Sequence, residues 1–299
     1  MLKQSTGNLM IRLVMLGTSA SLPSKQYHTS CMAVKYGKSM LFDACEGVQR
    51  QLMKYNVSFA SIDAIFLSHL HADHFLGLFG LVQSMNLSTR AAELVIYGPK
   101  GTAKFLDAVF ATKELRPNFP VKFVEIAASK KPFYETELFT VTAFNANHGT
   151  NALGYVLEGK PTHRFDKEKC EKVGIKGRNF SELEEGKTVT IKDRKYKYAD
   201  VTYEQPGKKI VYSGDGAPNS ELNAACKLAD ILVLDSTFAD EQKELAKEKR
   251  HSTASQAAAI AKKAKAKMLI LTHFSNRYDD RSVLLDEAKK KFGNSVLAA

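Results

Sequence analysis

The chain has 299 residues, a formal net charge of +11 and four cysteines, and 44% of its residues are hydrophobic. This length suits one large α/β domain with a buried core, and the composition excludes disordered and fibrous proteins. No apolar run approaches the roughly 18 residues that a membrane span needs, and the first residues lack the apolar segment of a secretory signal. We therefore expect a cytoplasmic protein with reduced thiols, and its excess of Lys and Arg favours a polyanionic partner.

Strand and helix patterns alternate along the chain, and no internal repeat interrupts them. Short β-branched and leucine-rich runs predict buried strands, and apolar residues spaced by three and four predict helices. Several predicted strands end in Asp or His, as in α/β enzymes that bind ligands at strand ends. The predicted strands cover 10–17, 31–44 (a hairpin turning at Gly37-Lys38), 63–68, 93–98, 209–215, 230–236 and 267–274, and the predicted helices cover 46–56, 75–86, 104–115 and 255–267.

Residues 159–207 break this alternation. They contain more Lys and Arg than Asp and Glu and few large aliphatic residues, so we expect them to build little core of their own. We interpret them as a basic arm inserted into a single domain of residues 1–299. The composition leaves two interpretations open, a solvated surface loop and an arm that contacts a polyanion.

The segment "SHLHADH", residues 68–74, follows a predicted strand and holds three histidines and one aspartate. In an extended chain His69 and His71 point to the same side, and the following turn can bring Asp73 and His74 round to face them. A single histidine is more often a surface or core residue than a ligand. Four such side chains in six positions instead predict a metal site, because crowded imidazoles without a metal would repel one another when protonated.

One cluster does not complete a metal site, so other segments have to supply further ligands. Zinc accepts imidazole nitrogen and carboxylate oxygen, and a catalytic site keeps a position open for water. His148 follows an alternating strand, His273 ends the strand "MLILTHF", and Asp215 ends "IVYSGDG". The glycines on both sides of Asp215 let a ligand approach the backbone closely. These three residues are the candidate ligands, whereas His28 and His163 are interpreted as surface residues.

The H-x-H-x-D-H motif of residues 69–74, with a later His, a Gly-Asp-Gly and a Thr-His-Phe, resembles the metallo-β-lactamase superfamily. Further segments narrow the resemblance to the ribonuclease Z family and stand in that family's order: "LGTSASLPSK", "LFDACEGVQRQL", "SGDGAPN", "HSTASQAAAIAKKA" and "LTHFSNRY". The similarity spans residues 11–292. It implies a four-layer αββα fold with an inserted arm, and an endonuclease that matures tRNA 3′ ends and leaves a 3′ hydroxyl.

The resemblance also implies a site for two metal ions, with Asp215 as their bridging ligand. Two such ions can activate water and stabilise the displacement at a phosphate. Zinc is expected, and manganese or iron would suit the same side chains. The resemblance assigns His69, His71 and His148 to one ion, and Asp73, His74 and His273 to the other, with Asp73 also orienting the attacking water.

His251 remains for proton transfer. Expelling a ribose 3′ oxygen is aided by a general acid with a pKa near neutrality. Asp235, at the end of "ILVLDSTF", is a natural partner to orient it, and the resemblance supports this pair, although the family usually has glutamate where Asp235 stands. On the residues alone, His251 is simply a residue before the helix "STASQAAA".

The resemblance aligns residues 159–207 with the family's tRNA-binding arm. It implies precursor tRNA as the partner and a homodimer in which one subunit's arm holds substrate for the other subunit's site. Lys172, Lys176 and Arg178, around the arm tip "GIKGRN", are predicted to contact RNA phosphates. That tip lacks the family's Gly-Pro-rich sequence, and residues 26–28, "QYH", stand where the family commonly has Arg-Asn.

Three other functions stay open. A phosphodiesterase or arylsulfatase would use the same metal site on a small substrate. A metallo-β-lactamase proper or a thioesterase would need a different ligand set or substrate pocket, and neither accounts for the arm. A non-catalytic RNA-binding module would be expected to have lost at least one metal ligand, whereas all seven are present.

Overall fold

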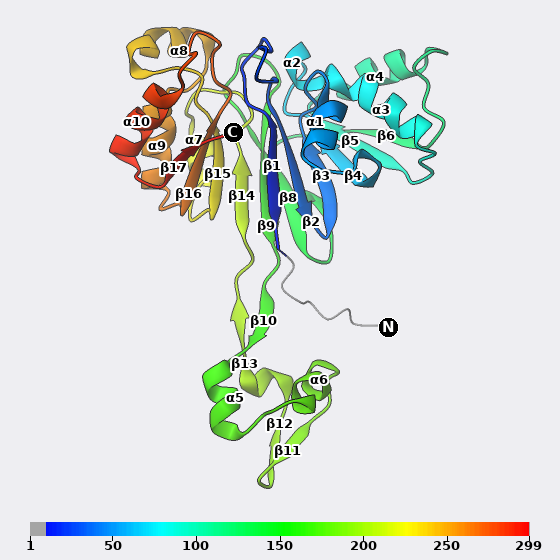
Figure 1. Ribbon diagram of the computed structural model, residues 1–299, viewed down its shortest axis with the longest axis vertical. Helices are drawn as coiled ribbons and strands as arrows, with labels where there is room; N and C mark the ends of the chain where they lie inside the picture. The colour runs from blue at the N-terminus through cyan, green and yellow to red at the C-terminus, as the bar shows by residue number, and fades with distance from the viewer. Residues whose placement is uncertain (1–9, 299) are drawn as a thin grey trace. The chain divides into compact units, whose positions relative to one another are not determined.

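The computed structural model describes residues 10–298 (Figure 1). Residues 1–9, whose sequence argues against a secretory signal, and residue 299 lie outside the described residues. The chain divides into two compact units, which we call the body, residues 11–158 and 209–298, and the arm, Gly159–Lys208. Among residues 10–298, no helix is both long and apolar enough to cross a bilayer.

Two mixed sheets form the body (Figure 1). In both sheets antiparallel strands precede a parallel group, so the chain alternates between strand and helix only in part of each sheet. The strands of the first sheet pair in the order β1 (Arg12–Gly17), β2 (Cys31–Tyr36), β3 (Lys38–Phe42), β4 (Ile62–Phe66), β5 (Leu94–Gly98) and β6 (Val121–Glu125). The strands of the second sheet pair in the order β17 (Ser295–Leu297), β16 (Met268–Thr272), β15 (Ile231–Asp235), β14 (Lys209–Tyr212), β9 (Leu153–Gly159), β8 (Phe139–Asn145) and β7 (Ser129–Glu135).

Helices cover the outer face of each sheet. Buried side chains gather in three apolar clusters of the body, one between the sheets and one beneath each helical layer. The expected four-layer αββα fold is therefore confirmed. The helices on the side of the first sheet are α1 (Val48–Lys54), α2 (Ala72–Phe75), α3 (Gly77–Leu87) and α4 (Thr102–Phe110), and those on the side of the second are α7 (Ser220–Ala225), α8 (Lys243–Lys249), α9 (Ala254–Lys263) and α10 (Ser282–Lys291).

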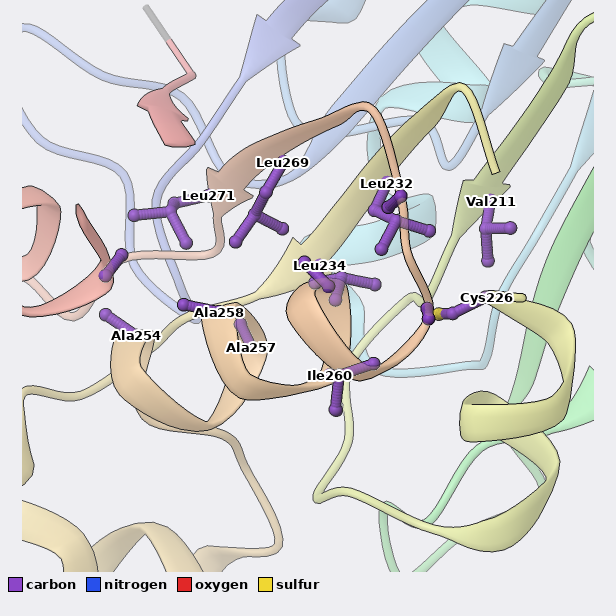
Figure 2. Close-up of a cluster of buried hydrophobic side chains, with 14 of the residues drawn as sticks. Val211, Cys226, Leu232, Leu234, Ala254, Ala257, Ala258, Ile260, Leu269 and Leu271 are labelled. Atoms are coloured by element: carbon purple, nitrogen blue, oxygen red, sulfur yellow. The ribbon is translucent and has the colours of Figure 1, made fainter. Parts of the chain in front are cut away.

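The inner strands of the second sheet supply two clusters at once, because successive side chains of a strand point to opposite faces. In β15, Leu232 and Leu234 pack beneath the helices, whereas Val233 belongs to the layer between the sheets. Figure 2 shows the helix-side cluster, in which α9 presents Ala257 and neighbouring alanines toward the strands. Each fully buried leucine there contributes about 1.5–3 kcal/mol to folding.

One helix begins earlier than predicted. The apolar pattern places its start at Phe75, whereas α2 begins at Ala72 and is preceded by an extended His71. Asp73 and His74 therefore lie in the first helical turn. This position favours a negatively charged side chain, because the helix N-terminus carries a partial positive charge.

The helix predicted over 104–115 also differs, since α4 ends at Phe110. Two residues later the hydroxyl of Thr112 donates to the carbonyl of Val109 at 2.7 Å. Such a bond from a side chain competes with continuation of the helix. These two differences concern helix boundaries, and so does the end of α9 at Lys263 instead of the predicted residue 267. The predicted strands all appear in the two sheets.

The arm contains a small core of its own, so the prediction that it builds little core is wrong. Its apolar residues are scattered singly along the sequence, and they converge only when the helices and strands of the arm form. The elements of the arm are β10 (Thr162–Phe165), α5 (Lys167–Val173), α6 (Arg178–Glu184), β11 (Val189–Ile191), β12 (Arg194–Tyr196) and β13 (Thr202–Gln205). The buried side chains are Cys170, Ile175, Leu183, Val189 and Val201.

Candidate metal centre

The histidine-rich segment lies where the chain leaves the carboxyl end of β4. His69 follows the strand, His71 is extended, and Asp73 and His74 lie in the first turn of α2. His69 and His74 are fully buried, whereas His71 is exposed. An extended stretch followed by one helical turn therefore directs these four side chains toward one place.

Three later segments bring further candidate ligands to this place. His148 follows β8, Asp215 follows β14, and His273 follows β16. The carboxyl ends of parallel strands such as β14 and β16 meet at one edge of a sheet, where ligands commonly bind. The ligand atoms form two groups, in each of which all atoms lie within 4.8 Å of one another: His69, His71 and His148 in the first, and Asp73, His74, Asp215 and His273 in the second.

Asp215 is close to both groups. Its Oδ2 lies 3.9 Å from Nε2 of His69 and 3.8 Å from Nε2 of His148. The same oxygen lies 3.2 Å from Nε2 of His74 and 2.9 Å from Nε2 of His273. Burial alone raises the pKa of Asp215, but the charges of His273 and His74 outweigh it and hold that pKa well below its usual range. The residue is therefore a carboxylate placed as a bridging ligand would be.

Gly214 explains how Asp215 reaches the first histidine segment. Its φ is +58°, a left-handed conformation that favours glycine. A Cβ at this position would lie 2.9 Å from Cβ of Ser68. The glycine before Asp215 thus lets the chain after β14 pass close to Ser68, which directly precedes His69.

Three imidazole nitrogens indicate that the cluster suits metal ions. Nε2 of His69, His74 and His273 is buried and makes no hydrogen bond. A buried polar atom without a partner costs about 1–3 kcal/mol, so three of them around one carboxylate need an explanation. Divalent cations supply it, because imidazole nitrogen and carboxylate oxygen are ligands of zinc and also suit manganese and iron.

Asp43, a fully buried residue after β3, is a site residue that sequence reasoning misses. Its Oδ2 accepts hydrogen bonds from Nδ1 of His74 (2.8 Å), the Tyr212 hydroxyl (2.7 Å) and the Ser68 hydroxyl (2.9 Å). Because Ser68 gives its proton to Asp43, its oxygen accepts from Nδ1 of His69 at 3.0 Å. Nε2 of His69 and of His74 therefore carries the lone pair that a metal ligand needs. The sequence feature that could have identified Asp43 is its position directly after the apolar run "MLF", residues 40–42.

We expect Asp43→Asn to weaken metal binding about 10–100-fold. The amide would turn an N–H group toward donors that now point at a carboxylate oxygen. Competition against a chelator of known affinity measures the change. Asp63→Asn is the matched control, because Asp63 accepts the N–H of Ser39 (2.8 Å) and pairs with Lys38 (3.0 Å), away from the cluster. Unchanged affinity in Asp43→Asn would contradict its orienting role.

His148 is oriented by backbone rather than by a side chain. Its Nδ1 donates to the carbonyl of Arg250 at 3.4 Å, and its Nε2 lies 3.1 Å from Nδ1 of His71. Arg250 adopts a left-handed φ of 56°, which is uncommon for a residue other than glycine. Sequence reasoning misses Arg250, because a contact through a carbonyl leaves no trace in the residue type.

His251 and Asp235 form a pair beside the cluster. Nδ1 of His251 lies 2.7 Å from Oδ2 of Asp235, whose other oxygen accepts from the N–H (3.0 Å) and hydroxyl (2.7 Å) of Thr237. The Thr237 oxygen accepts in turn from Nδ1 of His273 at 2.8 Å. Burial alone lowers the pKa of His251, but the Asp235 carboxylate outweighs it and raises the pKa to about 9. His251 therefore carries a proton at neutral pH, as a general acid must.

A cleft of about 590 Å³ opens at the cluster. Lys249 and Arg277 add positive charge to its lining, and Leu22 and Phe238 add apolar surface, so the cleft suits a nucleotide strand. The lining residues are Ala20–Leu22, His71, Asp73, His148, Asp215, Thr237, Phe238, Leu245, Lys249, His251 and Ser275–Arg277.

The predicted RNA-contacting residues of the arm, Lys172, Lys176 and Arg178, are exposed around the turn between α5 and α6. Arg178 lies 3.2 Å from Glu182, but its side chain is 87% exposed, and such a surface ion pair holds it only weakly. Sequence reasoning misses a second exposed basic group in the β11–β12 hairpin, although its members stand together in "KDRKYK", residues 192–197. Its members are Lys192, Arg194, Lys195 and Lys197.

The two histidines interpreted as surface residues stand outside both ligand groups. His163 is exposed in the arm. His28 is only half-buried, and its Nδ1 lies 3.1 Å from the carbonyl oxygen of Glu46. Neither residue contributes an atom to the cluster.

Family models match two parts of the chain. Residues 11–158 match the family described as "Anti-Pycsar protein Apyc1", and residues 178–274 match the "Beta-lactamase superfamily domain". Among solved structures, the metallo-beta-lactamase fold protein YhfI from Bacillus subtilis has a TM-score of 0.70 and 20% identity, covering 96% of this chain and 95% of that one. At that identity the likeness shows the fold alone.

Other proteins are more similar in sequence. The ribonuclease Z of Methanosarcina mazei is 37% identical, covering 97% of this chain and 96% of the relative, and that of Nitrosopumilus maritimus is 39% identical, covering 97% of each. The crystal structure of the short form of human tRNase Z has a TM-score of 0.70 and 27% identity, covering 97% of this chain and 96% of that one. With 37–39% identity to such relatives over 97% of its length, the chain belongs to the ribonuclease Z family.

Proposed function

We propose that the protein is a metal-dependent endoribonuclease that cleaves precursor tRNA on the 3′ side of the acceptor stem and leaves a 3′ hydroxyl. The observation that carries this proposal is the arrangement of two ligand groups around Asp215, with the His251–Asp235 pair lining the same cleft. Membership of the ribonuclease Z family and the likeness to human tRNase Z support tRNA as the substrate. We infer a cytoplasmic enzyme that uses two zinc ions.

The ligand groups and Asp73 prepare the attack on the phosphate. Two divalent cations bound there would supply Lewis-acid activation of water and of the phosphoryl oxygens. Burial alone raises the pKa of Asp73, but the charge of His74, whose Nε2 lies 3.3 Å from Oδ2 of Asp73, holds that pKa well below its usual range. Asp73 is therefore an acceptor in the cleft that can orient the hydrogen of an attacking water.

His251 assists the departure of the ribose 3′ oxygen. Asp235 holds Nδ1, so the proton available for transfer is on Nε2. Cations bound nearby would lower the pKa of His251 from about 9 toward neutrality, where a proton donor works best. The P–O3′ bond breaks as this proton reaches the oxygen, and the trailer keeps the phosphate.

The arm supplies affinity for the RNA backbone. Lys172, Lys176 and Arg178 are exposed cations that can neutralise phosphates, and the β11–β12 hairpin carries further ones. We infer a homodimer in which the arm of one subunit holds the tRNA that the other subunit cuts.

We expect alanine at all three of Lys172, Lys176 and Arg178 to raise KM for precursor tRNA. The slope of log(kcat/KM) against the logarithm of the salt concentration should become shallower by about one unit for each phosphate that the arm no longer neutralises. Turnover of a small phosphodiester should not change. The matched control removes the same charge from the exposed end of α10, with Lys289, Lys290 and Lys291 changed to alanine. An equal loss in both triple variants would mean that only net charge matters.

The experiment that tests the function compares a precursor tRNA with its CCA-ended counterpart, incubated with the metal-loaded protein. The cut is mapped to a single nucleotide, and the chemistry of both new ends is determined. The expected product ends in a 3′ hydroxyl directly after the acceptor stem. Weak tRNA cleavage beside fast turnover of a small diester would instead favour a small-substrate phosphodiesterase, and RNA binding without cleavage would favour a non-catalytic module.

A further inference from the structure

Arg281 is a buried guanidinium that the proposed mechanism leaves unused. It directly precedes α10 and is only 7% exposed. Its Cζ lies 3.6 Å from the ring centroid of Tyr27 and 4.7 Å from that of Phe274. Within residues 10–298 no carboxylate forms an ion pair with it, and its Nε has no hydrogen-bond partner. Aromatic faces and neutral hydroxyls therefore take the place of the usual counter-charge.

The terminal nitrogens of Arg281 bind one loop, which we call the entry loop, residues 18–28. One nitrogen donates to the Thr18 hydroxyl at 2.8 Å, and the other donates to the Ser19 hydroxyl at 2.9 Å. Tyr27, which stacks on the same guanidinium, is near the other end of the loop. A single side chain thus contacts both ends of the entry loop.

The entry loop forms one wall of the metal cleft. Residues 20–22 line the cleft, and so do residues 275–277 on the segment that follows His273. The N–H of Ala20 donates to the carbonyl of Phe274, and the N–H of Phe274 donates to the carbonyl of Thr18, both at 2.8 Å. Arg281 contacts Thr18 and also stacks on Phe274. It therefore touches the two residues whose backbones join the entry loop to the segment that follows His273.

The energetics of this arrangement favour a role in the site. A buried charge without an ionic partner costs several kcal/mol of solvation, so a fold rarely keeps one for stability alone. Lysine would not reproduce the contacts, since it lacks the planar fork that donates to two hydroxyls while stacking on rings. The entry loop also supplies Tyr27, the ring on which the guanidinium of Arg281 stacks most closely.

We propose that Arg281 is a positioning residue that fixes the entry loop and thereby shapes the wall of the cleft against which the substrate strand lies. This inference rests on the proposed function, because the strand is that of precursor tRNA. His273 keeps its own hydrogen bond to Thr237, so Arg281 acts on substrate placement rather than on metal binding.

The test uses the metal-loaded, full-length protein with Arg281→Met and Arg281→Lys. For both variants kcat/KM on precursor tRNA is expected to fall about 10²-fold, because a small displacement of a positioning element has effects of this size. Metal content and turnover of bis(p-nitrophenyl) phosphate should stay near the wild-type values. Tryptic cleavage after Lys25, an exposed residue of the entry loop, should become faster.

Arg90→Met is the matched control. Arg90 also stacks on an aromatic ring, that of Phe119 at 5.5 Å, and donates to three backbone carbonyls outside the cleft. Its removal should lower the melting temperature without changing kcat/KM or cleavage at Lys25. An Arg281→Lys enzyme with wild-type kcat/KM would overturn the proposal, and so would equal losses on both substrates together with loss of metal.

Two further outcomes are separable. If Arg281→Met does not fold, Tyr27→Leu replaces it, because Tyr27 is half-buried and its loss removes one of the two rings on which Arg281 stacks. Unchanged kcat/KM and unchanged Lys25 cleavage in that variant would overturn the inference. If the wild-type protein does not cut precursor tRNA, the proposed function fails. In that case faster cleavage after Lys25 in Arg281→Met, with unchanged diester turnover, would support the role of Arg281, and unchanged cleavage after Lys25 would overturn it.

Discussion

Asp215→Asn is expected to lower kcat by about 10³-fold or more on both precursor tRNA and a small phosphodiester, since several kcal/mol of charge stabilisation depend on the cations that this residue would share. Its Oδ2 lies within 3.9 Å of Nε2 on four histidines. The amide keeps the shape of the side chain but removes the charge that holds two cations together. Steady-state rates on both substrates and the metal content of the purified variant measure the effect.

Asp230→Asn is the matched control for this change. Asp230 precedes β15 and therefore lies at the opposite end of the parallel strands from Asp215. It accepts the N–H of Lys209 at 2.9 Å and pairs with Lys267 at 2.7 Å. Its metal content and rates should match those of the wild type. A fully active, fully metallated Asp215→Asn would contradict the assignment of Asp215 as a shared ligand.

His251→Ala is expected to lower kcat on precursor tRNA by about 10²–10⁴-fold, the usual contribution of a general acid. Its effect on bis(p-nitrophenyl) phosphate should be far smaller, because nitrophenolate leaves without needing a proton. Asp235→Asn should show the same selectivity, since the amide no longer holds a protonated imidazole. The ratio of the losses on the two substrates is the measurement.

A role of His251 as a metal ligand would give a different result. His148, Asp215 and His251 place ligand atoms within 4.8 Å of one another, so His251 has the geometry of a metal ligand as well. Equal losses on both substrates, with reduced metal content, would assign it to metal binding instead of proton transfer. His163→Ala removes an exposed histidine of the arm and serves as the control for the loss of an imidazole.

Each element and ligand segment that the sequence predicts is marked by a local pattern of neighbouring residues. "SHLHADH" lies directly after an apolar run, and the ends of "IVYSGD" and "MLILTH" carry one ligand each, so strand prediction and ligand prediction support each other. Parallel strands then place these ends at one edge of the sheet. The two ligand groups therefore follow from local sequence together with the topology of the fold.

The residues that sequence reasoning misses act across long separations or through the backbone. Asp43 meets His74 across the neighbouring strands β3 and β4 and meets Tyr212 only after both sheets pack together, and Arg250 contributes a carbonyl. Arg281 contacts Thr18 across the whole length of the body's sequence. The core of the arm is missed for the same reason, because its five buried side chains are isolated in the sequence and meet only in three dimensions.

Anomalous diffraction from crystals of the zinc-loaded protein, measured on both sides of the zinc absorption edge, determines whether Asp215 is shared by two metal ions. We expect two zinc peaks in contact with Asp215, one beside His69, His71 and His148 and the other beside Asp73, His74 and His273. A single peak in zinc-replete crystals, or peaks only at other side chains, would contradict this expectation.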